Sequence, residues 1–190
     1  MALTRKIYMN RSTLDKLIAS TGLIIALVLL AAAGGLLYAH NFVHSQVHDQ
    51  LAAEQITFPA AGSAGLASLP AADQAAVSRY AGQQLLTGAQ AEVFADHYIA
   101  VHLSKAGGGK TYAALSTASL AAPTDQKLAG QVQTVFRGET LRGLLLNAYA
   151  FDTMAIVAKF AAIGSLAAGS ILLVLAGLGF YHSSRVKKSR

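Results

Sequence analysis

The chain has 190 residues, enough for one modest domain, and it is strongly basic, with a formal net charge of +6. Hydrophobic residues make up 54% of it and charged residues only 13%, whereas soluble domains carry about a quarter charged residues, so the composition argues against an ordinary soluble protein. The absence of cysteine excludes disulfides, thioether-linked haem and thiolate metal sites.

Two uninterrupted apolar segments predict membrane helices. Residues 17–39 and 160–181 contain no Asp, Glu, Lys or Arg. Because about 20 apolar residues span the hydrocarbon core as a helix, both segments are long enough. We therefore predict a two-pass protein with tails at 1–16 and 182–190 and a central domain at 40–159. A cleaved signal peptide is the less favoured alternative for the first segment, because a signal core is usually about 7–15 apolar residues long.

The positive charges gather at the two ends of the chain. Residues 1–16 carry four basic residues and one acid, residues 182–190 carry four basic residues and no acid, and residues 41–152 carry six basic residues against eight acids. The positive-inside bias places both tails in the cytoplasm and the central domain outside the plasma membrane. We interpret the tails as topology anchors and contacts to anionic lipid. No aromatic residues alternate with these basic ones, so we expect no nucleic-acid partner.

Helix-breaking residues divide the central domain into segments of helical length. Residues 40–55 continue the first membrane helix, residues 71–86, 89–106 and 111–122 form shorter helices, and residues 124–151 lead into the second membrane helix with Thr124 as its N-cap. The predicted fold is all-α, with two transmembrane helices and an extracytoplasmic helical domain inserted between them. Small residues four apart, such as Gly22 with Ala26 and Ser165 with Gly169, indicate close helix contacts.

Three histidines are the most distinctive polar feature. His40, His44 and His48 are four residues apart, so they form one stripe on the predicted helix. Imidazoles at this spacing can ligate a metal ion, with Asp49, or with a histidine of a neighbouring helix, completing the shell. Alternatively, the three side chains face water, headgroups or another subunit, or form a pH-responsive contact, since imidazole titrates near neutrality.

The stretch SKAGGGKT, residues 104–111, resembles the end of a phosphate-binding loop. The loop pattern G-x-x-x-x-G-K-[ST] requires a glycine where this chain has Ser104, and the predicted topology places the stretch outside the cell, so we expect no bound nucleotide. We interpret it instead as a corner between two helices. Gly107 is expected to take the left-handed conformation, and Thr111 is expected to cap the next helix.

No pattern of residues indicates catalysis. The chain has no nucleophile elbow and no dinucleotide fingerprint. Glu92 and Asp96 are interpreted as a solvated edge, and Arg142 as an ion-pair partner of Glu139 three residues before it. We therefore predict that the protein is not an enzyme and holds no cofactor.

Three short motifs carry a resemblance to a known family: LAAEQITFP at 51–59, HLSKAGGGKTYAAL at 102–115 and LRGLLLNAYAF at 141–151. Together with the two apolar segments, they resemble a family of small actinobacterial two-pass membrane proteins often labelled "aromatic ring-opening dioxygenase". The resemblance implies an actinobacterial plasma membrane and leaves the function uncharacterised. The shared structural signature falls on His102, Gly108, Gly109, Lys110, Thr111, Tyr112, Leu141 and Arg142.

These features together predict a non-catalytic accessory or interaction subunit that docks on a larger membrane complex, for instance a respiratory one. Its expected partners are the lipid bilayer and other membrane-protein subunits, and Lys110, Tyr112 and Arg142 are the candidate interaction residues. The alternative is an extracytoplasmic ligand- or metal-binding or sensing module that uses the histidine stripe. The tails of 16 and nine residues are too short to form a signalling output domain.

Overall fold

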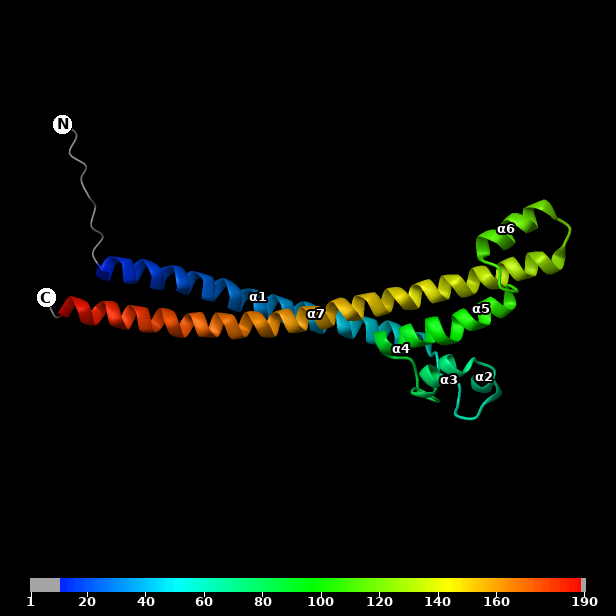
Figure 1. Ribbon diagram of the computed structural model, residues 1–190, viewed down its shortest axis with the longest axis horizontal. Helices are drawn as coiled ribbons and strands as arrows, with labels where there is room; N and C mark the ends of the chain where they lie inside the picture. The colour runs from blue at the N-terminus through cyan, green and yellow to red at the C-terminus, as the bar shows by residue number, and fades with distance from the viewer. Residues whose placement is uncertain (1–10, 189–190) are drawn as a thin grey trace, which may run out of the picture. The chain divides into compact units, whose positions relative to one another are not determined.

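The computed structural model describes residues 11–188, with side chains to residue 185, and its regular structure in this range is helical apart from one isolated β-bridge (Figure 1). The predicted tail residues Arg5, Lys6 and Arg190 lie outside the described residues. The elements in chain order are α1 (Arg11–Glu54), α2 (Ala64–Ala67), α3 (Ala71–Ser78), α4 (Gly88–Val93), the π-helix η1 (Phe94–Ile99), α5 (Ala100–Ala106), α6 (Tyr112–Ala121) and α7 (Gln126–Lys188).

The two longest helices confirm the prediction of two long apolar helices. α1 has 44 residues and α7 has 63, and each contains a window that is long and apolar enough to cross a membrane. Residues 40–54 continue α1 without a break, and the segment that follows residue 126 runs into the second apolar stretch within α7. Both continuations were predicted from the absence of helix breakers.

The chain divides into two compact units, and α1 and α7 contribute to both. The first unit contains the described residues up to His40 together with those from Ile156 onward, and the second is Asn41–Ala155. These limits lie close to the predicted domain limits of 40–159. The predicted limits concern the membrane, however, and they stay predictions.

In the first unit, α1 and α7 run antiparallel (Figure 1), and small residues are buried along both helices. The hydroxyls of Ser12 and Ser183, close to the two chain ends, lie 3.3 Å apart. A Cβ built on Gly169 would lie 3.0 Å from Leu30 Cγ, so the helices approach too closely there for a larger residue. The buried residues recur every seven positions, a spacing that keeps one seam of each helix facing the other: Ala19, Ala26 and Ala33 on α1, and Ala162, Gly169, Ala176 and Ser183 on α7.

The second unit has a hydrophobic core under α4, η1 and α5, which follow one another without a break. Its aromatic centre is Phe58, whose ring meets Phe94 edge-on at 5.2 Å and Tyr80 at 5.3 Å. Leu51 of α1 and Leu145 of α7 belong to the same cluster. The prediction of a helix at 89–106 is confirmed. Its middle part, η1, is a π-helix, whose turn is wider than that of an α-helix.

The predicted helix at 71–86 is wrong beyond Ser78. α3 ends there, and Gly82 follows in the left-handed conformation with a φ of 72°. The chain then pairs with the segment after α1: Thr57 forms an antiparallel bridge with Gln84, and the N–H of the fully buried Leu85 donates to Ile56 O at 2.8 Å. Burial of Leu85 and this strand-like pairing replace the helix that was predicted from the length of the segment between helix breakers. The short helix α2 was not predicted.

The glycine corner differs from its predicted conformation. Gly107 has a φ of −81°, so the predicted left-handed conformation at this residue is wrong. It remains in the right-handed region because its N–H still donates to Leu103 O at 2.8 Å. The left-handed residues are Gly108 and Gly109, with φ of 59° and 75°. Gly107 is nevertheless sterically required, because a Cβ there would lie 2.7 Å from Lys110 O.

Two predicted helix caps have different outcomes. Thr111 caps α6 as predicted, with its hydroxyl accepting from Ala114 N–H at 3.3 Å. The prediction of Thr124 as the cap of α7 is wrong by one residue. The carboxylate of Asp125 accepts from Leu128 N–H at 3.0 Å, because α7 begins only at Gln126.

Candidate functional site

A buried carboxylate joins three helices of the second unit. Asp152 of α7 has a side chain only 7% exposed, and its Oδ1 lies 2.7 Å from Nδ1 of His44 on α1. Its Oδ2 accepts from the backbone N–H of Gly88, the first residue of α4, at 3.0 Å. An ionised carboxylate only accepts hydrogen bonds, so in that state His44 Nδ1 is the donor. We call these three residues the Asp152 junction.

Local sequence explains why α4 begins at this carboxylate. Thr87 and Gln90 form a capping box, in which each side chain bonds the backbone N–H of the other residue. Gly88 lies between them, and a Cβ there would be 2.5 Å from the Cβ of Asp152. The first residue of α4 must therefore be glycine for α7 to come this close, and the carboxylate satisfies one of the N–H groups that a helix start leaves unpaired.

The structure distributes the predicted metal ligands among different contacts. His44 belongs to the Asp152 junction, and His48 Nδ1 lies 3.2 Å from Oδ1 of the neighbouring Asp49. His40 is partly buried and belongs to the first unit. Within residues 11–188, no three His, Cys, Asp or Glu residues come together in a group that could hold a metal ion. The metal site stays a prediction that this geometry does not favour.

The π-helix η1 directs two polar side chains to different helices. Asp96 Oδ1 accepts from Nη2 of Arg142 on α7 at 2.7 Å, and His97 Nδ1 lies 2.8 Å from Oδ1 of Asp73 on α3. The hydrogen bond to Asp96 raises the pKa of Arg142 above its usual value, against the opposing effect of burial. Asp96 is thus an ion-pair partner, not the purely solvated edge that the sequence predicted. The predicted pair of Arg142 with Glu139 is confirmed at 3.6 Å.

The three predicted interaction residues have different surroundings. Lys110 is exposed at the corner between α5 and α6. Tyr112 packs its ring against Phe136 at 5.5 Å and so holds α6 on α7. Arg142 is held by its two carboxylate partners and fixes η1 to α7. Lys110 and Tyr112 are both exposed, and a role in partner binding stays a prediction for all three residues.

An apolar groove runs between α1 and α7 in the second unit. It has a volume of about 300 Å³, and its most exposed large apolar side chains are Leu144 and Phe151, which are 61% and 55% exposed. Gln50, Glu54 and Asn147 supply its polar atoms. We call this feature the Leu144 groove. Its remaining lining residues are Val47, Leu51, Leu141, Leu145 and Ala148.

Sequence reasoning missed both the groove and the junction. The groove had a readable signal, because Leu141, Leu144, Ala148 and Phe151 recur at three- and four-residue steps, as an apolar helix face does. The junction had none, since nothing local to Asp152 indicates contact with residues 64 and 108 positions away.

Comparisons with protein-family models, with curated proteins and with solved structures find no match to this chain. The resemblance to the actinobacterial two-pass family therefore stays a prediction. What the chain does must be inferred from its own geometry.

Proposed function

We propose that the protein is a non-catalytic, two-pass protein of the plasma membrane that serves as an accessory subunit and binds a larger membrane complex through the Leu144 groove. Both termini lie in the cytoplasm and the second unit lies outside. The two apolar helices and the basic tails support this topology.

The observation that carries the proposal is an exposed apolar face on the part of α7 that precedes the predicted membrane-spanning segment. Leu144 and Phe151 lie outside the predicted spanning segment 160–181, yet more than half of each side chain is exposed. Large contiguous apolar surface exposed to water marks interaction sites in soluble regions of proteins. The groove beside these residues also contains polar atoms of Gln50, Glu54 and Asn147. A mixture of apolar and polar groups gives a protein interface its specificity.

Charge and composition support a protein partner over a small ligand. The groove is lined by two helices, α1 and α7, and a groove between helices can accept an apolar helix face from a partner. Its one ionisable lining residue is Glu54, so a partner segment with a basic residue at that end is complementary.

The test is purification of the full chain from its native membrane in mild detergent, with identification and quantification of the chains that co-purify. We expect a partner at fixed stoichiometry, lost in the double variant Leu144→Asn, Phe151→Asn. The matched control is Leu120→Asn, which replaces a leucine 81% exposed on α6, away from the groove, and should retain the partner. A chain that purifies only as a monomer or homodimer, or a partner retained by the double variant, would overturn the proposal.

A further inference from the structure

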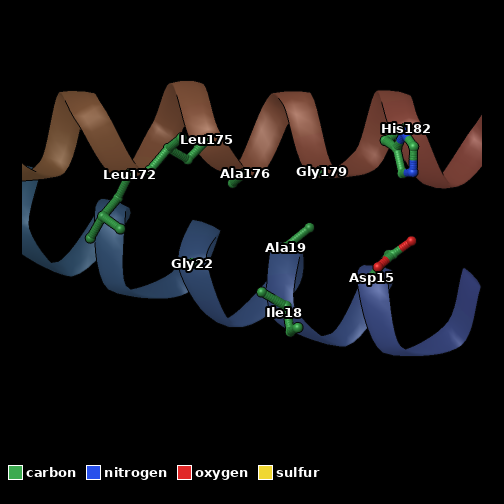
Figure 2. Close-up of a pocket in the computed structure, with 9 residues that line it drawn as sticks. All are labelled: Asp15, Ile18, Ala19, Gly22, Leu172, Leu175, Ala176, Gly179 and His182. Atoms are coloured by element: carbon green, nitrogen blue, oxygen red, sulfur yellow. The ribbon is translucent and has the colours of Figure 1, made fainter. Parts of the chain in front are cut away.

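A second cavity lies within the first unit, between the two apolar helices near their terminal ends (Figure 2). It has a volume of about 280 Å³ and is bounded by residues 15–22 of α1 and residues 172–182 of α7. Four small residues leave this space open: Ala19 and Gly22 on α1, Ala176 and Gly179 on α7.

The cavity is apolar along most of its length and polar at one end. Ile18, Leu172 and Leu175 form its apolar wall. Ile18 and Leu175 are 64% and 56% exposed on the helix pair, so the cavity adjoins the surface that faces lipid under the proposed topology. At the polar end, the carboxylate of Asp15 and the ring of His182 point toward one another across the two helices (Figure 2).

One carboxylate oxygen of Asp15 lacks a hydrogen-bond partner among the described residues. Its Oδ2 is inaccessible to solvent and makes no hydrogen bond within residues 11–188. A buried polar oxygen without a donor is unfavourable, and a carboxylate more so. A ligand that donates a hydrogen bond to this carboxylate would offset that cost.

Cationic side chains flank the polar end on the side of the chain termini. Arg11 lies one turn before Asp15, and Arg185 lies one turn after His182, so each shares a helix face with its neighbour in the cavity. Both are exposed, and the guanidinium of Arg185 lies 4.9 Å from the centre of the Tyr181 ring. Guanidinium groups are well suited to bind phosphate.

We propose that this cavity binds one phospholipid whose headgroup carries a primary ammonium. This inference rests on the membrane location that is part of the proposed function. An acyl chain lies along Ile18, Leu172 and Leu175, the ammonium donates to the carboxylate of Asp15 and to the ring of His182, and the phosphate meets the two arginines. A quaternary choline headgroup has no N–H, so it cannot satisfy Asp15, and a glycerol headgroup brings no positive charge to it.

The test is native mass spectrometry of the full chain after exchange into mixed micelles. The micelles contain equal amounts of phosphatidylethanolamine, phosphatidylcholine and phosphatidylglycerol with identical acyl chains. We expect one retained phosphatidylethanolamine per chain in preference to the other two lipids. Asp15→Asn should weaken its retention by about tenfold, the effect of losing one charge-assisted hydrogen bond. Asp49→Asn removes the same charge at an exposed site and should leave retention unchanged.

A second pair of variants tests the cavity itself. Gly22→Leu fills the space and should abolish lipid retention, whereas Gly34→Leu, on the same helix with nothing within 4 Å of an added Cβ, should not. Equal retention of the three lipids, preference for phosphatidylglycerol, or unchanged retention in Asp15→Asn would overturn the inference. Resistance of the chain to carbonate extraction from membranes separates these outcomes from failure of the membrane location itself.

Discussion

Asp152 is the residue whose replacement should most clearly reveal how the second unit is held together. Its two carboxylate oxygens accept from His44 and from Gly88 N–H, whereas an asparagine amide offers only one acceptor oxygen. We expect Asp152→Asn to destabilise the second unit by about 1–3 kcal/mol, the cost of an unsatisfied or uncharged partner in a buried hydrogen bond. Thermal unfolding in detergent gives the total effect, and hydrogen exchange of residues 88–93 localises it to α4.

The control for this residue is Asp49→Asn, because Asp49 is 69% exposed and pairs only with its near neighbours in the described contacts. It should leave both measurements unchanged. If the two variants behave alike, or if α4 stays protected in Asp152→Asn, the Asp152 junction does not stabilise the unit.

At the scale of elements, the contact between α5 and α7 depends on a glycine. A Cβ added at Gly138 of α7 would overlap the side chain of Leu103, which is buried in the core. We expect Gly138→Ala to destabilise the second unit by about 1–3 kcal/mol through overpacking. Gly130→Ala, on the same helix with open space, should instead stabilise the helix by about 0.5–1 kcal/mol.

A double-mutant cycle makes this prediction sharper. Leu103→Ala removes the atoms that the new methyl group would meet, so Gly138→Ala should no longer destabilise the unit in that background. Chemical denaturation of the four proteins in one detergent measures the coupling. Additive effects would show that the glycine is needed for some reason other than the approach of α5.

The elements themselves were largely predictable from sequence, because helix length and periodicity are local. The apolar pattern and the helix-breaking glycines and prolines together predict both long helices, the helical stretch at 88–106 and α6. The prediction failed at 79–86, where the pairing of Thr57 with Gln84 is formed by residues distant in sequence. It also failed at the glycine corner, since three consecutive glycines do not reveal which one leaves the right-handed region.

The candidate sites were less predictable than the helices. The histidine stripe was visible, but the partner of His44 is Asp152, and no local pattern links the two. Likewise, Asp15 and His182 are near opposite ends of the chain, so only the antiparallel contact of α1 with α7 brings them to one cavity. The Leu144 groove is the exception, since half of it can be read from the apolar spacing in 141–151.

At the scale of the whole molecule, the proposals share one requirement, which is two membrane passes with the second unit outside. The chain has no cysteine, so single cysteines can be introduced without removing any native one. Leu120 and Leu144 are exposed positions in the second unit, and Ser184 is exposed near the end of α7. Leu120 and Ser184 report on which side of the membrane the second unit and the end of α7 lie. Leu144 reports on whether a partner covers the Leu144 groove.

The most direct measurement is the labelling rate of Leu120→Cys, Leu144→Cys and Ser184→Cys with a membrane-impermeant maleimide in intact cells of the native host. We predict rapid labelling of Leu120→Cys, labelling of Ser184→Cys only after permeabilisation, and protection of Leu144→Cys that disappears once the chain is purified free of its partner. Labelling of Leu120→Cys only after permeabilisation would contradict the topology. Equal labelling of Leu144→Cys and Leu120→Cys in intact cells would contradict a partner in the groove.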